Sequence, residues 1–296
     1  MPVPRTLLYR RPSTLEEAIG ELGEDDALPL AGGTSLALLM NLGLIAPEKL
    51  VSLNAIPGLR GIATSDGTVQ IGALTTHAEI ATDPQLCAAI PAVRDAFGRV
   101  GNVRIRAWGT VGGNLAHADP ASDPPVLLSA LGAEVVAVGP DGERRIAVSA
   151  FADGSFSTAL APAEILTAVV LPVPAPETRS AYIKFLPRTA EDYATVSAAA
   201  ALHVDDRGLV RDASLVLGSV GPAPVVCDRA AALLSGQRLD DQDVLDAVAS
   251  AVRETVTPTS DGRGSADYKR QVAGVIACRA LTACAPNCPS AEAGRR

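Results

Sequence analysis

The stretches Ala31-Gly32-Gly33-Thr34-Ser35 and Gly109-Thr110-Val111-Gly112-Gly113-Asn114 decide how this chain is interpreted. Each places paired glycines where strand-like sequence ends, flanked by hydroxyl or amide side chains. Glycine lets backbone N–H groups approach a ligand closely, and a helix that begins there adds the positive end of its dipole. Two such stretches in one chain favour a backbone cradle that holds a long, phosphate-bearing cofactor from both sides.

Neither stretch matches a standard nucleotide-binding motif. The G-x-G-x-x-G pattern is absent from both, and no lysine follows the glycines as in a Walker A loop. The alternative is that both stretches are tight turns between packed elements, in a scaffold protein without a cofactor. The glycines alone leave these two interpretations open.

Composition narrows the class of protein. The chain has 296 residues, enough for two or three compact units, and 48% of them are hydrophobic but only 3% aromatic, so the core is mainly aliphatic. The net charge of −8 argues against nucleic-acid binding. Residues 1–13 lack the apolar core of a signal peptide, no segment is apolar enough for a membrane span, and five dispersed cysteines do not resemble a disulfide framework. We expect a cytoplasmic protein.

Strand and helix signals alternate in the first part of the chain and separate in the last. A capping box at Ser13 and Glu16 predicts a helix to Leu22, and a second box at Thr76 and Glu79 opens another helical region. The other elements expected before residue 150 are strands over 27–31 and 49–54, a helix over 35–42, and hairpins pairing 61–62 with 69–71 and 134–138 with 144–148. A proline-rich linker is predicted at 172–176, followed by strands over 181–186, 195–204 and 209–220 and then helices over 229–234, 242–256 and 266–284. Strands followed by helices predict an α+β C-terminal unit.

Five blocks, taken together and in order, resemble the FAD-binding medium subunit of the molybdenum hydroxylases, the family of xanthine dehydrogenase and aerobic carbon monoxide dehydrogenase. The blocks are Ala31-Gly32-Gly33-Thr34-Ser35-Leu36, Ile71-Gly72-Ala73-Leu74-Thr75-Thr76-His77, residues 109–123, residues 180–185 with 194–199, and residues 261–270. One departure is Arg106-Ala107-Trp108, where the family often has Arg-Asn before the second glycine stretch. The resemblance covers nearly the whole chain.

The resemblance implies an α+β protein of two domains. Residues 1–175 would form an FAD-binding domain of the vanillyl-alcohol-oxidase (PCMH) type, with subdomains of about 1–58 and 59–175. Residues 176–285 would form a smaller α+β domain of the CO dehydrogenase flavoprotein C-terminal type, and residues 286–296 a tail.

By the same resemblance, the chain binds FAD and carries no catalytic residue or metal of its own. The implied FAD-binding residues are Leu30, Ala31, Gly32, Gly33, Thr34, Ser35, Leu36, Thr110, Val111, Gly112, Gly113, Asn114, His117, Asp123, Leu166 and Lys184. Lys184 would lie near the flavin ring, where a cation stabilises negative charge on the reduced flavin, and Tyr193 is a further candidate neighbour of the ring. Thr34 stands where some relatives carry histidine, so FAD is expected to be held non-covalently.

The implied function is electron transfer. A large molybdopterin-binding subunit and a small [2Fe-2S] subunit would be the partners, assembled as a dimer of heterotrimers, and FAD would pass electrons to an external acceptor. The alternative is a stand-alone FAD-dependent oxidase or dehydrogenase with its own substrate site.

For three single residues near the blocks, we expect a structural role and not a role in binding or catalysis. His77, in the second capping box, is expected to be solvated or bonded to the backbone. Asp119 is expected to start a turn, and Trp108 to anchor local packing rather than to shield a flavin.

Overall fold

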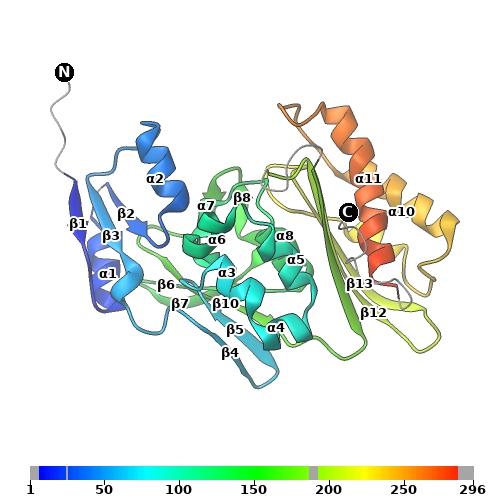
Figure 1. Cartoon of the computed structure of the whole chain (residues 1–296), viewed down its shortest axis with the longest axis horizontal. Coiled ribbons are helices and arrows are strands. Elements are labelled where there is room, and N and C mark those ends of the chain that lie inside the picture. The colour runs from blue at the N-terminus through cyan, green and yellow to red at the C-terminus, as the bar shows by residue number, and fades with distance from the viewer. Residues whose placement is uncertain (1–6, 25, 187–192, 286–296) are drawn as a thin grey trace.

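The computed structural model describes residues 7–24, 26–186 and 193–285. These residues form sheets of three, five and four strands and a two-stranded ribbon. Figure 1 shows the three larger sheets following one another along the long axis of the molecule, from the blue N-terminal end to the helices of the C-terminal end. Helices and strands are mixed throughout, which confirms the α+β class.

The first sheet is parallel, with strand order β1-β3-β2. Its elements are β1 (Leu8–Arg10), α1 (Leu15–Leu22), β2 (Ala27–Leu30), α2 (Thr34–Asn41), β3 (Lys49–Ser52) and a 3-10 turn, η1 (Leu53–Ala55). The capping box of α1 lies one residue later than expected. Thr14 is the N-cap, so Glu17 and not Glu16 occupies the third helical position, and the Glu17 N–H donates to the Thr14 hydroxyl. The strand expected over 49–54 ends at Ser52.

The second sheet is antiparallel, with strand order β4-β5-β10-β6-β7. Its strands are β4 (Ile62–Ser65), β5 (Thr68–Gly72), β6 (Glu134–Gly139), β7 (Gly142–Ala147) and β10 (Ile165–Pro172). The hairpins β4–β5 and β6–β7 were both predicted, but the central strand β10 was not. It joins the two hairpins, and its last residue, Pro172, pairs with Thr68 at the end of the sheet. The expected linker therefore begins one residue later.

Six short helices connect β5 to β6 and cover one side of the second sheet (Figure 1). They are α3 (His77–Thr82), α4 (Pro84–Ala89), α5 (Ala92–Gly98), α6 (Val103–Trp108), α7 (Val111–His117) and α8 (Pro124–Ala130). The turn η2 (Val148–Ala150) and the ribbon of β8 (Ala152–Gly154) and β9 (Ser157–Thr158) complete this part.

The third sheet is antiparallel, with strand order β11-β12-β13-β14, and its three long strands lie where the sequence predicts them. Its elements are β11 (Thr178–Phe185), β12 (Val196–Val204), β13 (Val210–Gly218), β14 (Val225–Val226), α9 (Asp228–Ala232), α10 (Gln242–Thr255) and α11 (Ala266–Ala283). Helices α10 and α11 share a hydrophobic cluster with one face of this sheet.

The opposite face of the third sheet packs on the helices of the second. Tyr182, Ala199 and Val216 of the third sheet lie in the same buried cluster as Phe97 of α5 and Leu127 of α8. Side chains of β11 are therefore held against the helical layer that carries the second glycine stretch.

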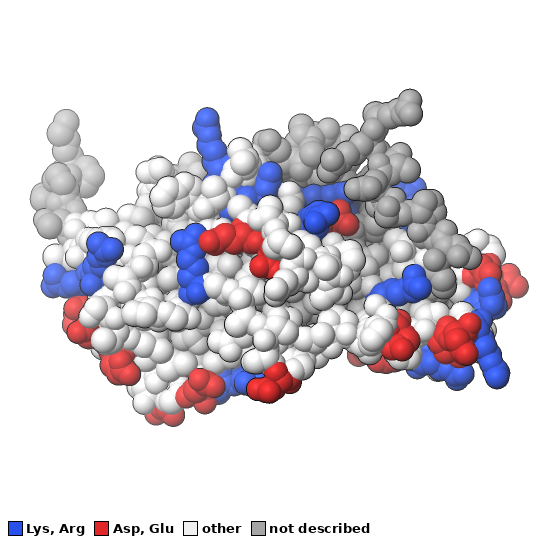
Figure 2. Space-filling view, turned by 60° about the horizontal axis from the view of Figure 1, so that its bottom comes forward, with Lys and Arg blue, Asp and Glu red and all other residues white. Residues whose placement is uncertain are grey.

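Charged side chains of both signs are scattered over the face shown in Figure 2, at its margins and also near its middle, with uncharged surface between them. This agrees with the scattered acidity of the sequence. Among the described residues, no helix is both long and apolar enough to span a membrane.

Candidate functional site

A cavity of about 720 Å³ lies where the three larger sheets meet. Its walls come from the loop between β2 and α2, from α6 and α7, from β10, and from β11. The volume falls within the range of about 300–1,000 Å³ that is usual for small-molecule and cofactor sites.

The first glycine stretch forms the wall at the start of α2. Gly33 is the N-cap of this helix and has φ +72°, a left-handed conformation that glycine adopts without strain. No side chain caps α2. Among the described residues, the backbone N–H groups of Thr34, Ser35 and Leu36 have no acceptor, as expected for the first turn of an uncapped helix. The start of α2 therefore presents free donors and a positive dipole end to the cavity.

Gly32 is required for a different reason. A Cβ added to Gly32 would lie 1.9 Å from the carbonyl oxygen of Trp108, so only glycine allows the β2–α2 loop to pass this close to the end of α6. The loop is also held from η1, because Asn54 Nδ2 donates to the carbonyl of Ala31 (3.1 Å). The structure thus brings the two glycine stretches together, with a Cβ on Gly113 only 3.8 Å from the Ala31 Cβ.

The second glycine stretch is held by the block Ile71–His77. Val111 N donates to the carbonyl of Thr75 (3.0 Å), and Gly112 N donates to the carbonyl of Ala73 (2.9 Å). Gly113 N donates to Thr110 Oγ1 (3.1 Å). These donors already have acceptors inside the protein, so the second stretch contributes a close-packed wall and not the free backbone donors that its glycines suggested.

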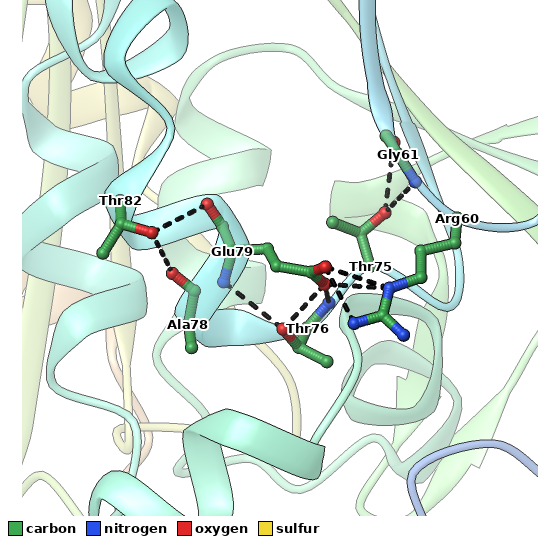
Figure 3. Close-up of polar contacts among 7 residues, drawn as sticks. All are labelled: Arg60, Gly61, Thr75, Thr76, Ala78, Glu79 and Thr82. Carbon is green, nitrogen blue, oxygen red and sulfur yellow. Dashed lines mark hydrogen bonds and ion pairs between the residues drawn. The ribbon is translucent and has the colours of Figure 1, made fainter.

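The block itself is anchored by polar contacts (Figure 3). Thr75 Oγ1 accepts from Gly61 N (2.9 Å) and donates to the carbonyl of Gly61 (3.1 Å). Glu79 Oε2 accepts from Thr76 N (2.8 Å), which confirms the predicted capping box, and the Glu79 carboxylate pairs with Arg60 (2.8 Å). These contacts explain why the block accompanies the second glycine stretch.

The cavity gathers nearly all the residues expected to bind FAD. Leu30 and Val111 do not line it: the Leu30 side chain lies against Gly33, and Val111 is fully buried. The expected residues that do line it are Ala31, Gly32, Gly33, Thr34, Ser35, Leu36, Thr110, Gly112, Gly113, Asn114, His117, Asp123, Leu166 and Lys184, and Tyr193 joins them. Asn114 Oδ1 accepts from Ser122 Oγ (2.9 Å), which fixes the amide in the wall.

At the far end of the cavity from α2, a buried ion pair joins the helical layer to the third sheet. Lys184 Nζ lies 2.8 Å from Asp123 Oδ2 and also donates to the carbonyl of Arg99 (3.0 Å). Tyr182 donates from its hydroxyl to Asp123 Oδ1 (2.5 Å). Burial raises the pKa of Asp123, and Lys184 and Tyr182 oppose that rise. Asp123 therefore balances the charge of Lys184, a partner that the sequence analysis did not identify.

Tyr182 was missed as a site residue. It lies within a predicted strand and within the block 180–185, but no role was assigned to it, and its ring does not line the cavity. The period of two along a strand places residues 182 and 184 on the same face, so the position of Lys184 was a signal that could have identified it.

Tyr193 lies at the cavity wall beside Asp119 and Arg263. Its side chain is 50% exposed, and desolvation followed by the charge of Asp119 raises the pKa of its hydroxyl to about 12. The Arg263 guanidinium lies 5.8 Å from the ring centroid, and Lys269 pairs with Asp261 (2.8 Å) in the same motif. The C-terminal block over 261–270 therefore supports Tyr193. Asp119 Oδ1 accepts from Ala121 N (2.9 Å), the predicted turn.

Two local expectations are wrong. The Trp108 side chain is 70% exposed, so its carbonyl and not its ring takes part in the packing against Gly32. The His77 side chain is only 2% exposed, because its ring packs against Phe97 and Gly109 and not toward solvent. Burial, followed by the charge of Arg106, lowers the pKa of His77 to about 4.

We expect His77 to make the protein less stable in acid. Its folded-state pKa is depressed from 6.5 to about 4. The contribution of neutral His77 to the unfolding free energy is therefore fully present above pH 6.5 and is lost as the pH falls through 4. The full loss is about 3 kcal/mol of unfolding free energy. Urea unfolding of the wild type and of His77→Gln at pH 7, 5 and 4 measures it. The variant should lack this part of the pH slope, and equal slopes would contradict the assignment.

Comparisons with known proteins agree with this geometry. Residues 5–174 match the family model of the FAD binding domain in molybdopterin dehydrogenase, and residues 181–284 match the CO dehydrogenase flavoprotein C-terminal domain. The carbon monoxide dehydrogenase medium chain of Afipia carboxidovorans is 40% identical over 283 residues, covering 94% of this chain and 96% of the relative.

Solved structures give the same result. Reconstituted CO dehydrogenase from Oligotropha carboxidovorans superposes with a TM-score of 0.91 at 37% identity, covering 95% of this chain and 98% of that one. Quinoline 2-oxidoreductase from Pseudomonas putida 86 has a TM-score of 0.88 at 33% identity, covering 96% and 98%. The resemblance and fold expected from the sequence motifs are confirmed. The chain therefore belongs to the FAD-binding medium subunits of the molybdenum hydroxylases, which are oxidoreductases of several subunits.

Proposed function

We propose that FAD lies in the cavity, held without a covalent bond, with its pyrophosphate at the start of α2 and its flavin ring toward Lys184. The free N–H groups of Thr34, Ser35 and Leu36 carry this proposal, because an uncapped helix N-terminus is a site for phosphate. Thr34 offers a hydroxyl and no imidazole, which supports non-covalent binding.

The residues of the chain fall into four groups in this proposal. The start of α2 donates hydrogen bonds, while Thr110, Gly112 and Asn114 form the opposite wall and Leu166 adds an apolar surface. Leu30 and Val111 support the two stretches from behind. His117, Asp123, Lys184 and Tyr193 surround the end of the cavity nearest the third sheet.

When bound, FAD supplies the redox chemistry, accepting electrons from a partner subunit and passing them to an external acceptor. The chain would receive electrons from a small [2Fe-2S] subunit, which would be reduced by a large molybdopterin-binding subunit. We propose a dimer of such heterotrimers in the cytoplasm, with a boundary near residue 175 between the FAD-binding domain and the C-terminal domain. The similarity to the carbon monoxide dehydrogenase medium chain of Afipia carboxidovorans supports the presence of partner subunits.

The purified chain should take up about one equivalent of FAD and show a flavin absorption spectrum that a chemical reductant bleaches. FAD at 100 times its Kd should add about 2.7 kcal/mol to the unfolding free energy. The chain alone should oxidise no substrate of its assembled complex.

Two outcomes would contradict the proposal. A colourless chain that FAD neither binds nor stabilises would favour the scaffold alternative. Turnover of a small substrate by the isolated flavin-loaded chain would favour a stand-alone oxidase or dehydrogenase.

A further inference from the structure

The Tyr182 side chain does not line the cavity, yet it makes a shorter hydrogen bond to Asp123 than Lys184 does. Its hydroxyl lies 2.5 Å from Asp123 Oδ1, and its side chain is 2% exposed. The other carboxylate oxygen, Oδ2, is 2.8 Å from Lys184 Nζ. Each oxygen of Asp123 thus has one donor from β11, and both donors come from the same face of that strand.

Both donors favour the charged form of the Asp123 carboxylate, against the effect of burial on its pKa. Asp123 is 4% exposed, and an isolated carboxylate in such a place takes up a proton. Burial also raises the pKa of the Tyr182 hydroxyl well above its usual value, so Tyr182 remains a donor at every accessible pH. A hydrogen bond to a charged acceptor is about twice as strong as one between neutral groups.

The charge state of Asp123 determines how much positive charge the cavity contains. Lys184 lines the cavity, and its side chain is 1% exposed. With Asp123 ionised, the pair is neutral as a unit. With Asp123 protonated, the same ammonium has no counter-charge beside it.

We propose that Tyr182 is a positioning residue of the flavin site, an inference that rests on the proposed function. Tyr182 keeps Asp123 ionised and so determines how much of the Lys184 charge acts on the flavin. Tyr182 touches no cofactor in this arrangement and acts through Asp123. The other charged or titratable groups that act on this cluster are Arg99, at the end of α5, and Tyr193. The Arg99 side chain is 45% exposed and pairs with Asp95 (3.6 Å), so solvent and Asp95 screen it.

The test is a redox titration of the flavin-loaded chain over a range of pH. In Tyr182→Phe, Asp123 should protonate at a pH about one to two units higher than in the wild type, because a hydrogen bond to a charge is lost. Below that pH the uncompensated Lys184 should raise the flavin midpoint potential. Above it, the potential should equal that of the wild type.

Two controls separate this role from a structural one. In an Asp123→Asn background, adding Tyr182→Phe should leave the potential unchanged, because no carboxylate remains for the hydroxyl to stabilise. Tyr9→Phe removes a hydroxyl from a tyrosine that is 56% exposed, in β1 and away from the cavity, and should behave as the wild type. If Tyr182→Phe fails to fold, 3-fluorotyrosine at position 182 is the second variant. It keeps the ring, donates more strongly and should lower the pH at which Asp123 protonates.

A readout without flavin distinguishes failure of this inference from failure of the proposed function. Infrared titration of the flavin-free chain should show the carboxylic acid band of Asp123 at higher pH in Tyr182→Phe, and Asp123→Asn should remove that band. If the wild type binds no FAD but Tyr182→Phe still shifts the titration of Asp123, the flavin role is overturned and the coupling between Tyr182 and Asp123 stands. Identical titrations of the wild type and of both Tyr182 variants would overturn the inference.

Discussion

Gly32→Ala should abolish FAD binding by the purified chain. The new Cβ would lie 1.9 Å from the Trp108 carbonyl oxygen and 2.8 Å from its carbon, and both are backbone atoms that cannot rotate away. The β2–α2 loop must therefore move away from the end of α6, taking with it the free N–H groups at the start of α2. Losing two charge-assisted hydrogen bonds at about 1.5–3 kcal/mol each lowers the affinity by about 100-fold or more.

Gly20→Ala is the matched control for this substitution. Gly20 lies inside α1 with nothing within 4 Å of an added Cβ, so alanine should stabilise that helix slightly and leave FAD binding intact. Flavin content after dialysis, together with the Kd from fluorescence titration, measures both variants. Equal FAD affinity in Gly32→Ala and Gly20→Ala would show that the close approach of loop and helix is not needed for the site.

Lys184→Met should cost about 3–5 kcal/mol of unfolding free energy at neutral pH, because it leaves Asp123 as a buried carboxylate without its counter-charge. The folded-state pKa of Asp123, already raised by burial, should rise further. A carboxyl with a raised folded-state pKa is stabilising when protonated, below its unfolded pKa, and this contribution is lost as the pH rises through the folded value. The deficit relative to the wild type should therefore be small in acid and grow with pH.

The second substitution Asp123→Asn tests the cause of that deficit. In Lys184→Met with Asp123→Asn no charge remains to be compensated, so most of the stability at neutral pH should return and the added pH dependence should disappear. Urea unfolding at several pH values measures this. A deficit that is the same at every pH, or one that Asp123→Asn does not relieve, would indicate lost packing of the Lys184 side chain.

Local signals accounted for much of the fold because they depend on neighbouring residues. The capping box at Thr76 and Glu79 and the hairpins β4–β5 and β6–β7 follow from turn and cap chemistry, and all three are present. The missed strand β10 is different. It pairs with β5 and β6, which both precede it in the chain, β5 by more than 90 residues. The residues of β10 alone do not show that the two hairpins are joined by a strand between them.

The candidate site was also predicted only in part, because local sequence does not show which groups are brought together by packing. The glycine stretches marked its walls, but the sequence could not show that the donors of Gly112 are already bonded to the block at Ala73, or that the donors at the start of α2 are free. His77 was misjudged because its burial depends on Phe97 and Gly109, which reach it only through tertiary packing.

By itself, the sequence determined the family, the α+β class and many of the residues that line the cavity, because glycines, caps and turn residues act through their own backbone geometry. Only the tertiary structure decided the electrostatics of the site. Asp123 and Lys184 are 61 residues apart, and their 2.8 Å contact exists because the third sheet packs on α5 and α8. Charges interact strongly only when folding brings them together and removes water, so the balance between them is a property of the packed protein.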